Sequence, residues 1–284
     1  MESKAEFVVF GHRGGVGMTG LGENTIPAFK KALQDGADGI EFDVYVAKDA
    51  MGADNLVVIH DETVDRTTNG SGAVVDFSFE QLRALRVGDE KTQQVSEYTE
   101  RIPTAQEVID AVLAHDLAAG TSTVVNVELK GAGTAKPTAN LIHRYVNEGV
   151  SPEHFLVSSF DHPQLEEFHQ IYNEIPTAIL VDHHHFAAWS EQLAPAIELA
   201  KRLNSVAVNP GLYYMPVGAV DEIQKNGLRA YVWTDTTLDA IDKIDDRVLR
   251  ARNMGADGVF SDNPSTGRAA LERYLQNNVH RAID

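Results

Sequence analysis

Eight short apolar segments, separated by segments with helical character, recur along this 284-residue chain. An order of strand, helix, strand, helix is typical of a parallel sheet whose faces are covered by helices. Eight such units in a chain of this length predict a closed TIM (β/α)8 barrel of the α/β class. The predicted strands are residues 7–12, 38–46, 123–130, 154–160, 177–182, 205–210, 228–234 and 257–262.

Helix signals lie between these strands, and one region breaks the rhythm. Asn24 precedes an amphipathic segment and predicts a helix start, and Pro163 is expected in the first turn of another helix. Residues 47–103 contain an additional strand at 56–61, followed by turn-rich and amphipathic stretches. The whole chain, 1–284, is therefore predicted to form a single barrel domain with an insertion after the second barrel strand.

The composition narrows the possible partners. A formal net charge of −18 disfavours nucleic acid and anionic membrane surfaces, because polyanion binding depends on clustered Lys and Arg. The chain has no cysteine, which excludes disulfides, thiolate metal sites and a cysteine nucleophile. No apolar stretch approaches the roughly 18 residues of a membrane span, and no signal-peptide pattern opens the chain. We expect a cytoplasmic protein, unless a leader was removed, that acts on a small molecule without stable membrane insertion.

Acidic side chains alternate with apolar ones in two of the predicted strands. Glu41 and Asp43 share one face of the second strand, and Asn126, Glu128 and Lys130 share one face of the third. Barrel strands point alternate side chains inward, and barrel active sites lie at the C-terminal mouth. Glu41, Asp43 and Glu128 are therefore expected to converge there.

Three converging carboxylates would repel one another unless a positive charge lies between them. A hard divalent cation, Mg²⁺ or Ca²⁺, prefers oxygen ligands and would remove that repulsion, so we predict that one such ion binds here. The alternative is that the carboxylates pair with Arg or Lys inside the barrel, or that they face solvent at a sheet edge.

Two histidines end apolar runs near the same mouth. His12 closes the first strand, and His60 closes the run at 56–61. Imidazole titrates near neutral pH, so one histidine can accept a proton while the other donates one. Arg13 and Lys130 add positive groups beside them. A cation, two positive side chains, an acid and a base are what phosphoryl transfer requires.

Two further features near strand ends have simpler interpretations. The triplet His183, His184 and His185 follows the fifth predicted strand and could bind a transition metal, although adjacent loop residues rarely converge on one ion. Asp262 precedes the last helical segment, so we interpret it as a helix cap.

Motifs spread over nearly the whole chain match, in order, those of one known family. They are GHRGG at 11–15, ENTIPAF at 23–29, GADGIEFDV at 36–44, VVIHD at 57–61, DRTTNGSG at 65–72, VELK at 127–130, YVWT at 231–234 and GADGVFSDNP at 255–264. This ordered set resembles the glycerophosphodiester phosphodiesterases. The resemblance implies a barrel with an insertion after its second strand, and hydrolysis of glycerophosphodiesters to glycerol 3-phosphate and an alcohol.

The resemblance also implies roles for individual residues. The positions that match the acid/base histidines of the family are His12 and His60. Those that match its metal-binding carboxylates are Glu41, Asp43 and Glu128. Arg13 and Lys130 match positions that contact phosphate, and Trp233 matches an aromatic side chain that lines the substrate pocket.

Other functions are compatible with parts of this pattern. A phospholipase D-like enzyme could act on lysophospholipids or sphingolipids with the same site, but it would need an exposed apolar face around the mouth. A binding module without activity is disfavoured because the histidines and carboxylates are all present. A nuclease is disfavoured by the net charge of −18.

Overall fold

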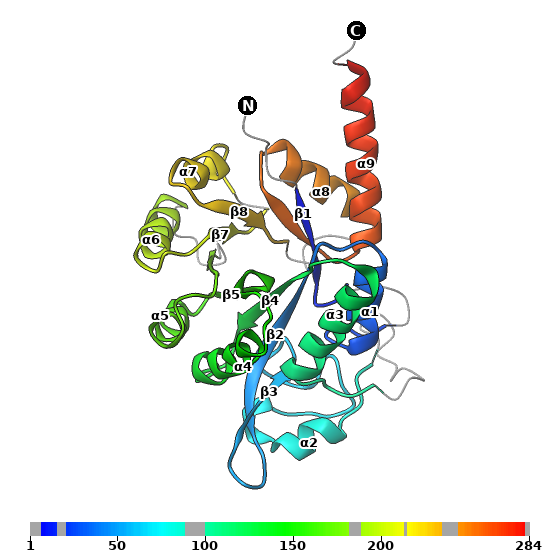
Figure 1. The fold of residues 1–284 in the computed structure, drawn as a ribbon, viewed down its shortest axis with the longest axis vertical. Helices are drawn as coiled ribbons and strands as arrows, with labels where there is room; N and C mark the ends of the chain where they lie inside the picture. The colour runs from blue at the N-terminus through cyan, green and yellow to red at the C-terminus, as the bar shows by residue number, and fades with distance from the viewer. Residues whose placement is uncertain are drawn as a thin grey trace.

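The computed structural model describes residues 7–15, 21–88, 100–181, 189–212, 215–234 and 244–281. The barrel strands are β1 (Val8–His12), β2 (Gly39–Lys48), β4 (Val124–Leu129), β5 (Phe155–Ser159), β6 (Thr177–Val181), β7 (Ala207–Pro210), β8 (Arg229–Val232) and β9 (Gly258–Ser261). They pair in the order β1-β9-β8-β7-β6-β5-β4-β2, and β1 also pairs with β2 (Figure 1). All of these pairs are parallel, so the predicted closed barrel is confirmed.

Helices follow the strands around the barrel. They are α1 (Ile26–Gln34), α3 (Ala105–Ala119), α4 (Ala135–Asn147), α5 (His162–Ile171), α6 (Trp189–Arg202), α7 (Ala219–Lys225), α8 (Ile244–Asn253) and α9 (Pro264–Arg281), with a short 3-10 turn at Pro152–His154. Pro163 lies in the first turn of α5, as predicted. Within the described ranges, no helix has the length and apolar character that crossing a bilayer requires.

The predicted start of α1 at Asn24 is wrong by one residue. Thr25 is the cap, and its Oγ1 accepts a hydrogen bond from the backbone N of Ala28. Asn24 instead has a φ of 56°, in the left-handed region. This conformation is tolerated better by Asn than by most residues, and the Asn24 side chain donates to Asp43 rather than capping the helix.

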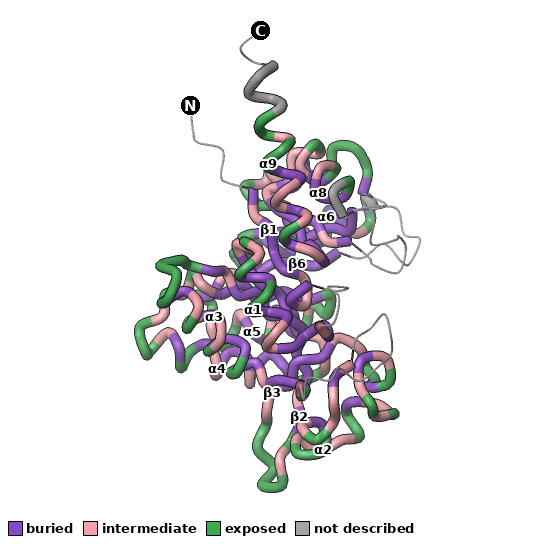
Figure 2. The backbone as a smooth tube through the Cα atoms, turned by 90° about the vertical axis from the view of Figure 1, so that its right-hand side faces the viewer, coloured by how far each residue is buried: buried purple, intermediate pink, exposed green. Residues whose placement is uncertain are grey.

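The strands carry apolar side chains on both faces. The outward set, which includes Ile40, Phe42 and Val44, packs under the helices in the main core. The inward set fills the barrel interior with a smaller cluster: Phe10, Leu156, Ala178, Ala207, Tyr231 and Phe260. Figure 2 shows this core as buried backbone along the strands. The inward polar side chains of β2 and β4 lie beyond this cluster, toward the C-terminal ends of the strands.

The insertion after β2 begins with a hairpin. β3 (Asp54–Val58) runs antiparallel to β2, and η1 (Val74–Asp76) and α2 (Phe79–Ala84) follow it. These elements share a small core that includes Tyr45, Val57 and Leu82, and they lie at one end of the molecule (Figure 1). β3 ends at Val58, three residues before the end of the strand predicted at 56–61. The backbone N of Ile59 then donates to the Asp43 carbonyl O at 3.2 Å. The hairpin therefore returns the chain to the mouth just before His60.

Asp116 fixes the connection between α3 and β4 at the opposite end of the barrel. Its carboxylate accepts hydrogen bonds from the Thr121 hydroxyl at 2.7 Å and from the Thr123 backbone N and hydroxyl at 2.9 and 2.7 Å. Burial alone would raise the pKa of Asp116, but the bonds from Thr123 and Thr121 outweigh burial and lower it.

We expect Asp116→Ala to lower the free energy of unfolding by about 1–3 kcal/mol, because the two buried donors of Thr123 and the Thr121 hydroxyl lose their acceptor. Urea denaturation measures this change. Since Asp116 lies far from the mouth, turnover per folded molecule should stay within about twofold of wild type. If the urea midpoint and the dependence of the unfolding free energy on urea were both unchanged, Asp116 would not stabilise the connection between α3 and β4.

Candidate active site

Three buried carboxylates from two neighbouring strands meet at the mouth. In the pairing of β2 with β4, Asp43 lies opposite Glu128 and Glu41 lies opposite Asn126. Glu41, Asp43 and Glu128 each offer a carboxylate oxygen, and these oxygens all lie within 4.8 Å of one another. The structure thus brings together the three residues that strand alternation places on the inner face.

Glu41 and Asp43 each use one oxygen within the protein. Glu41 Oε2 accepts from the backbone N of Arg13 at 3.1 Å, and Asp43 Oδ2 accepts from Asn24 Nδ2 at 3.1 Å. The other oxygens, Glu41 Oε1 and Asp43 Oδ1, are buried and accept no hydrogen bond from the described residues. Buried oxygens without donors are costly unless a cation occupies the space between them, so this donor set fits Mg²⁺ or Ca²⁺.

The electrostatics of Glu41 and Glu128 agree with that fit. Burial raises the pKa of Glu41 well above its ordinary value, and the nearby charges of Asp43 and Glu128 raise it further. Burial also raises the pKa of Glu128, although Lys130, whose Nζ lies 3.2 Å from Glu128 Oε1, acts in the opposite direction. Without a cation, Glu41 and Glu128 therefore keep their protons to a higher pH than isolated carboxylates do.

Asp43 behaves differently because positive groups surround it. Burial would raise its pKa, but the charges of His60, Arg13 and Lys130 and the hydrogen bond from Asn24 together lower it. Arg13 Nε lies 3.7 Å from Asp43 Oδ2. Asp43 is thus the carboxylate of the cluster that stays ionised most readily.

Arg13 and Asn24 reach the cluster through unusual backbone conformations. Arg13 has a φ of 51°, in the left-handed region like Asn24, and the Asn24 backbone N donates to the Arg13 carbonyl O at 2.8 Å. Such conformations cost energy in residues other than glycine, and they recur at functional sites. Here they direct both side chains toward Asp43. The contact of Asn24 with Asp43 was not predicted, because its position before a helix indicated a cap.

His12 lies at the end of β1 with both ring nitrogens near carboxylates. Its Nδ1 lies 2.7 Å from Asp262 Oδ1, and its Nε2 lies 3.9 Å from Glu41 Oε2. The interpretation of Asp262 as a helix cap is therefore wrong. Asn263 has that position instead, since its Oδ1 accepts from the backbone N of Thr266 at 3.1 Å.

His60 faces the carboxylate cluster from the insertion. Its Nδ1 lies 2.7 Å from Asp61 Oδ1, and its Nε2 lies 3.3 Å from Lys130 Nζ. Arg66 donates to both oxygens of Asp61, from Nε at 2.6 Å and from Nη2 at 2.8 Å, and it also bonds Glu23. The roles of Asp61, Arg66 and Glu23 were not predicted, although all three lie in the HD, DRTTNGSG and ENT segments.

Aromatic side chains line another part of the mouth. The Trp233 indole Nε1 donates to the Asn209 carbonyl O at 3.1 Å, which fixes the ring beside β7. The Phe160 ring contacts the Trp233 ring at right angles, with 5.4 Å between centroids, and Lys130 Nζ lies 6.0 Å from the Phe160 centroid. The Phe160 ring therefore lies between Trp233 and Lys130, the predicted phosphate-contacting residue. Phe160 was not among the predicted site residues. The triplet His183–His185 lies outside the described residues.

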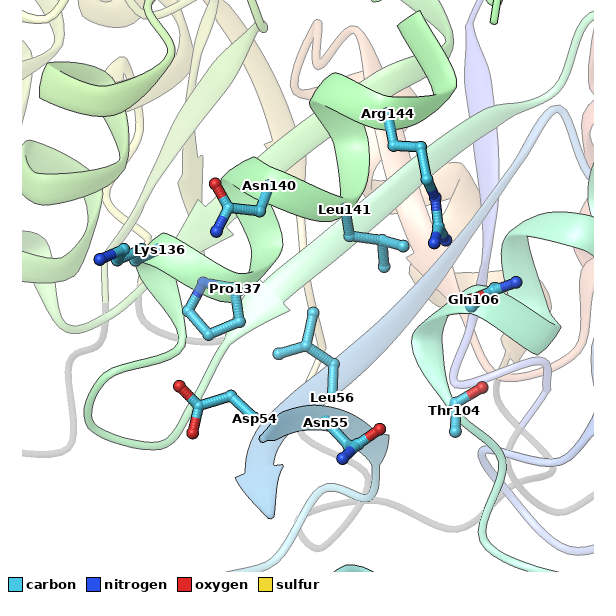
Figure 3. A pocket seen from close by; sticks show the side chains of 10 residues that line it. All are labelled: Asp54, Asn55, Leu56, Thr104, Gln106, Lys136, Pro137, Asn140, Leu141 and Arg144. Atoms are coloured by element: carbon cyan, nitrogen blue, oxygen red, sulfur yellow. The ribbon is translucent and has the colours of Figure 1, made fainter. Parts of the chain in front are cut away.

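A groove of about 530 Å³ lies elsewhere, between β3, α3 and α4 (Figure 3). Lys136 and Arg144, both from α4, lie along it together with polar side chains such as Asn140 and Gln106. None of the predicted site residues lines this groove, and it has no cluster of buried titratable groups. The buried carboxylates, the two histidines and Lys130 all lie at the mouth, so we place the candidate active site there.

Comparisons with known proteins identify the family of the chain. The family described as "Glycerophosphoryl diester phosphodiesterase family" matches residues 12–266. The chain is 32% identical over 262 residues to a glycerophosphodiester phosphodiesterase of Caldanaerobacter subterraneus, covering 91% of this chain and 95% of that protein.

Two solved structures resemble the fold over nearly its full length. A phosphodiesterase from Oleispira antarctica, in complex with the product sn-glycerol-3-phosphate, has a TM-score of 0.72 and 25% identity, covering 93% of this chain and 96% of that chain. A glycerophosphodiester phosphodiesterase from Agrobacterium tumefaciens has a TM-score of 0.67 and 25% identity, covering 93% and 99%.

Proposed function

Because the chain belongs to the glycerophosphoryl diester phosphodiesterase family, we propose that it hydrolyses glycerophosphodiesters to glycerol 3-phosphate and an alcohol with the help of one divalent cation. One observation carries this proposal. Glu41, Asp43 and Glu128 converge within 4.8 Å between the two histidines that match the acid/base pair of the family. A complex with sn-glycerol-3-phosphate in a phosphodiesterase of similar fold supports the substrate class.

Glu41, Asp43 and Glu128 would hold the cation, Mg²⁺ or Ca²⁺. When bound, the cation supplies positive charge that stabilises the phosphoryl oxygens during hydrolysis. Arg13 and Lys130 contact the same phosphate group from the protein side, and Trp233 lines the pocket for the substrate. Lys130, which points at His60 Nε2, is within reach of both the histidine and the carboxylate cluster.

His12 and His60 move the protons. His12 accepts a proton from the attacking oxygen, and His60 donates one to the leaving alcohol. In both histidines Nδ1 faces an aspartate, so Nε2 is the nitrogen that exchanges the proton with the substrate. At His60 this step requires the Lys130 ammonium, 3.3 Å from Nε2, to turn from the histidine to the phosphate. General acid–base catalysis of this kind contributes about 10²–10⁴-fold to the rate.

The direct test is a product assay on the purified protein. We expect glycerophosphocholine to give glycerol 3-phosphate and choline when Mg²⁺ or Ca²⁺ is present, and no product above background in excess chelator. Lysophosphatidylcholine serves as the comparison substrate. Choline release from lysophosphatidylcholine at an equal or higher rate would favour the phospholipase D-like alternative, and turnover that chelator does not reduce would contradict the cation dependence.

A further inference from the structure

We propose that Asp262 is a positioning residue for His12, with Arg247 holding the Asp262 carboxylate in place. This inference rests on the proposed base role of His12 and extends it to residues from the last part of the barrel. Asp262 follows β9, and Arg247 belongs to α8. Neither residue touches the carboxylate cluster, so both would act through His12.

The contact between His12 and Asp262 fixes the imidazole. His12 Nδ1 lies 2.7 Å from Asp262 Oδ1, and the Asp262 side chain is only 2% exposed. An ionised carboxylate can only accept hydrogen bonds, so Nδ1 must carry the hydrogen. The lone pair of the neutral ring is then on Nε2, the nitrogen that faces Glu41. A base that removes a proton at the mouth needs this tautomer.

Arg247 holds the second oxygen of the Asp262 carboxylate. Arg247 Nη1 donates to Asp262 Oδ2 at 3.2 Å, and the Arg247 side chain is 7% exposed. Each oxygen of Asp262 thus has its own partner, Oδ1 toward the imidazole and Oδ2 toward the guanidinium. A guanidinium can only donate hydrogen bonds, so Arg247 holds Oδ2 as an acceptor and leaves Oδ1 for the imidazole.

The same arrangement occurs at the second histidine. His60 Nδ1 lies 2.7 Å from Asp61, and Arg66 donates to both oxygens of Asp61. The two histidine–aspartate pairs are built differently along the chain. Asp61 directly follows His60, whereas Asp262 is 250 positions from His12. A carboxylate that only joined β9 to β1 would not require this repetition at both histidines. The repetition therefore points to control of the imidazoles.

Asp262→Asn gives a sharp test because Arg247 limits how the amide can turn. Asn has one carbonyl oxygen, and Arg247 can only donate, so the oxygen should face Arg247 and the NH₂ group should face His12. His12 Nδ1 must then accept, and the hydrogen moves to Nε2. We expect kcat for glycerophosphocholine to fall by about 10- to 1,000-fold with KM within about threefold of wild type.

The tautomer itself is measured by ¹H–¹⁵N NMR of the imidazole, with the His12 signals assigned by their loss in His12→Ala. Wild type should show hydrogen on Nδ1 of neutral His12, and Asp262→Asn should show it on Nε2. This readout does not depend on turnover. If wild type hydrolysed no glycerophosphodiester, the proposed function would fail while the tautomer still tested the role of Asp262.

The matched control is Asn263→Ala, which removes the neighbouring side chain that caps α9. It should lower the unfolding temperature by about 2–4 °C and leave kcat unchanged.

If Asp262→Asn does not fold, Arg247→Gln replaces it as the test variant, since Gln keeps a hydrogen-bond donor without the charge. We expect this variant to lower kcat by about three- to tenfold. Wild-type kcat in the folded Asp262 variant, or an unchanged His12 tautomer, would overturn the proposal.

Discussion

His60→Ala is expected to lower kcat for glycerophosphocholine by about 10²–10⁴-fold while leaving cation affinity unchanged. The imidazole lies beside Lys130 rather than among the carboxylate oxygens, so its removal takes away a proton donor without removing a cation ligand. Steady-state kinetics measures the first effect. The shift in unfolding temperature on titration with Mg²⁺ or Ca²⁺ measures the second.

A substrate with a 4-nitrophenyl leaving group separates the acid from the base. That leaving group departs without a proton, so His60→Ala should lose much less activity on it than on glycerophosphocholine, whereas His12→Ala should lose activity on both. His143→Ala, on the outer helix α4, is the matched control and should behave as wild type. Unchanged turnover of glycerophosphocholine by His60→Ala would refute the acid role.

Glu41→Gln should abolish the response to cations and reduce turnover by at least about 100-fold. A bound cation contributes several kcal/mol of charge stabilisation, and about 1.4 kcal/mol corresponds to a factor of ten in rate. An amide in place of the carboxylate removes one negative ligand of the three. The structure also predicts that, without a cation, this variant is at least as stable as wild type, because one member of a repelling cluster is gone.

The pH dependence of stability checks the same cluster without any turnover. In metal-free protein the pKa of Glu41 is raised well above 4.5, so the folded state holds a proton that the unfolded chain releases. The free energy of unfolding should therefore fall as pH rises from about 4.5 toward that raised pKa. Asp43 and Asp61 have lowered pKa values, so their contributions are lost only when pH falls below that window.

Thermal unfolding between about pH 5 and 8, in chelator and in saturating Mg²⁺ or Ca²⁺, measures how stability changes with pH. Wild type should lose stability with rising pH only in chelator, and Glu41→Gln should show a smaller slope. Glu153→Gln, at an exposed position of the opposite end, controls for the loss of one negative charge. Equal slopes with and without cation would mean that the carboxylates do not share an ion.

The sequence predicted the barrel because its strands are locally encoded. Each apolar run lies within a few residues of an observed strand, and alternation along β2 and β4 placed Glu41, Asp43 and Glu128 on the inner face. These inferences need only the two-residue period of side chains along a strand and the location of barrel active sites at the C-terminal mouth. The same local information led to errors where a residue serves a distant partner.

Asp262 and Asn24 illustrate these errors. Both precede helices, where Asp and Asn are common caps, and in both cases the neighbouring residue is the cap. Asn24 instead donates to Asp43, and Asp262 contacts His12, which is 250 positions away. Nothing in a local pattern distinguishes a capping carboxylate from one that contacts a histidine at the end of the neighbouring strand. The networks through Arg66 and Glu23 escaped prediction for the same reason.

The pairing of β1 with β9 has a consequence for how the protein matures on the ribosome. Synthesis delivers both histidines and the three clustered carboxylates within the first half of the chain, long before Asp262 emerges. The ring of His12 would therefore lack its contact with Asp262 until the final strand docked. Hydrolytic competence would then appear abruptly, near the end of translation, and would coincide with closure of the fold.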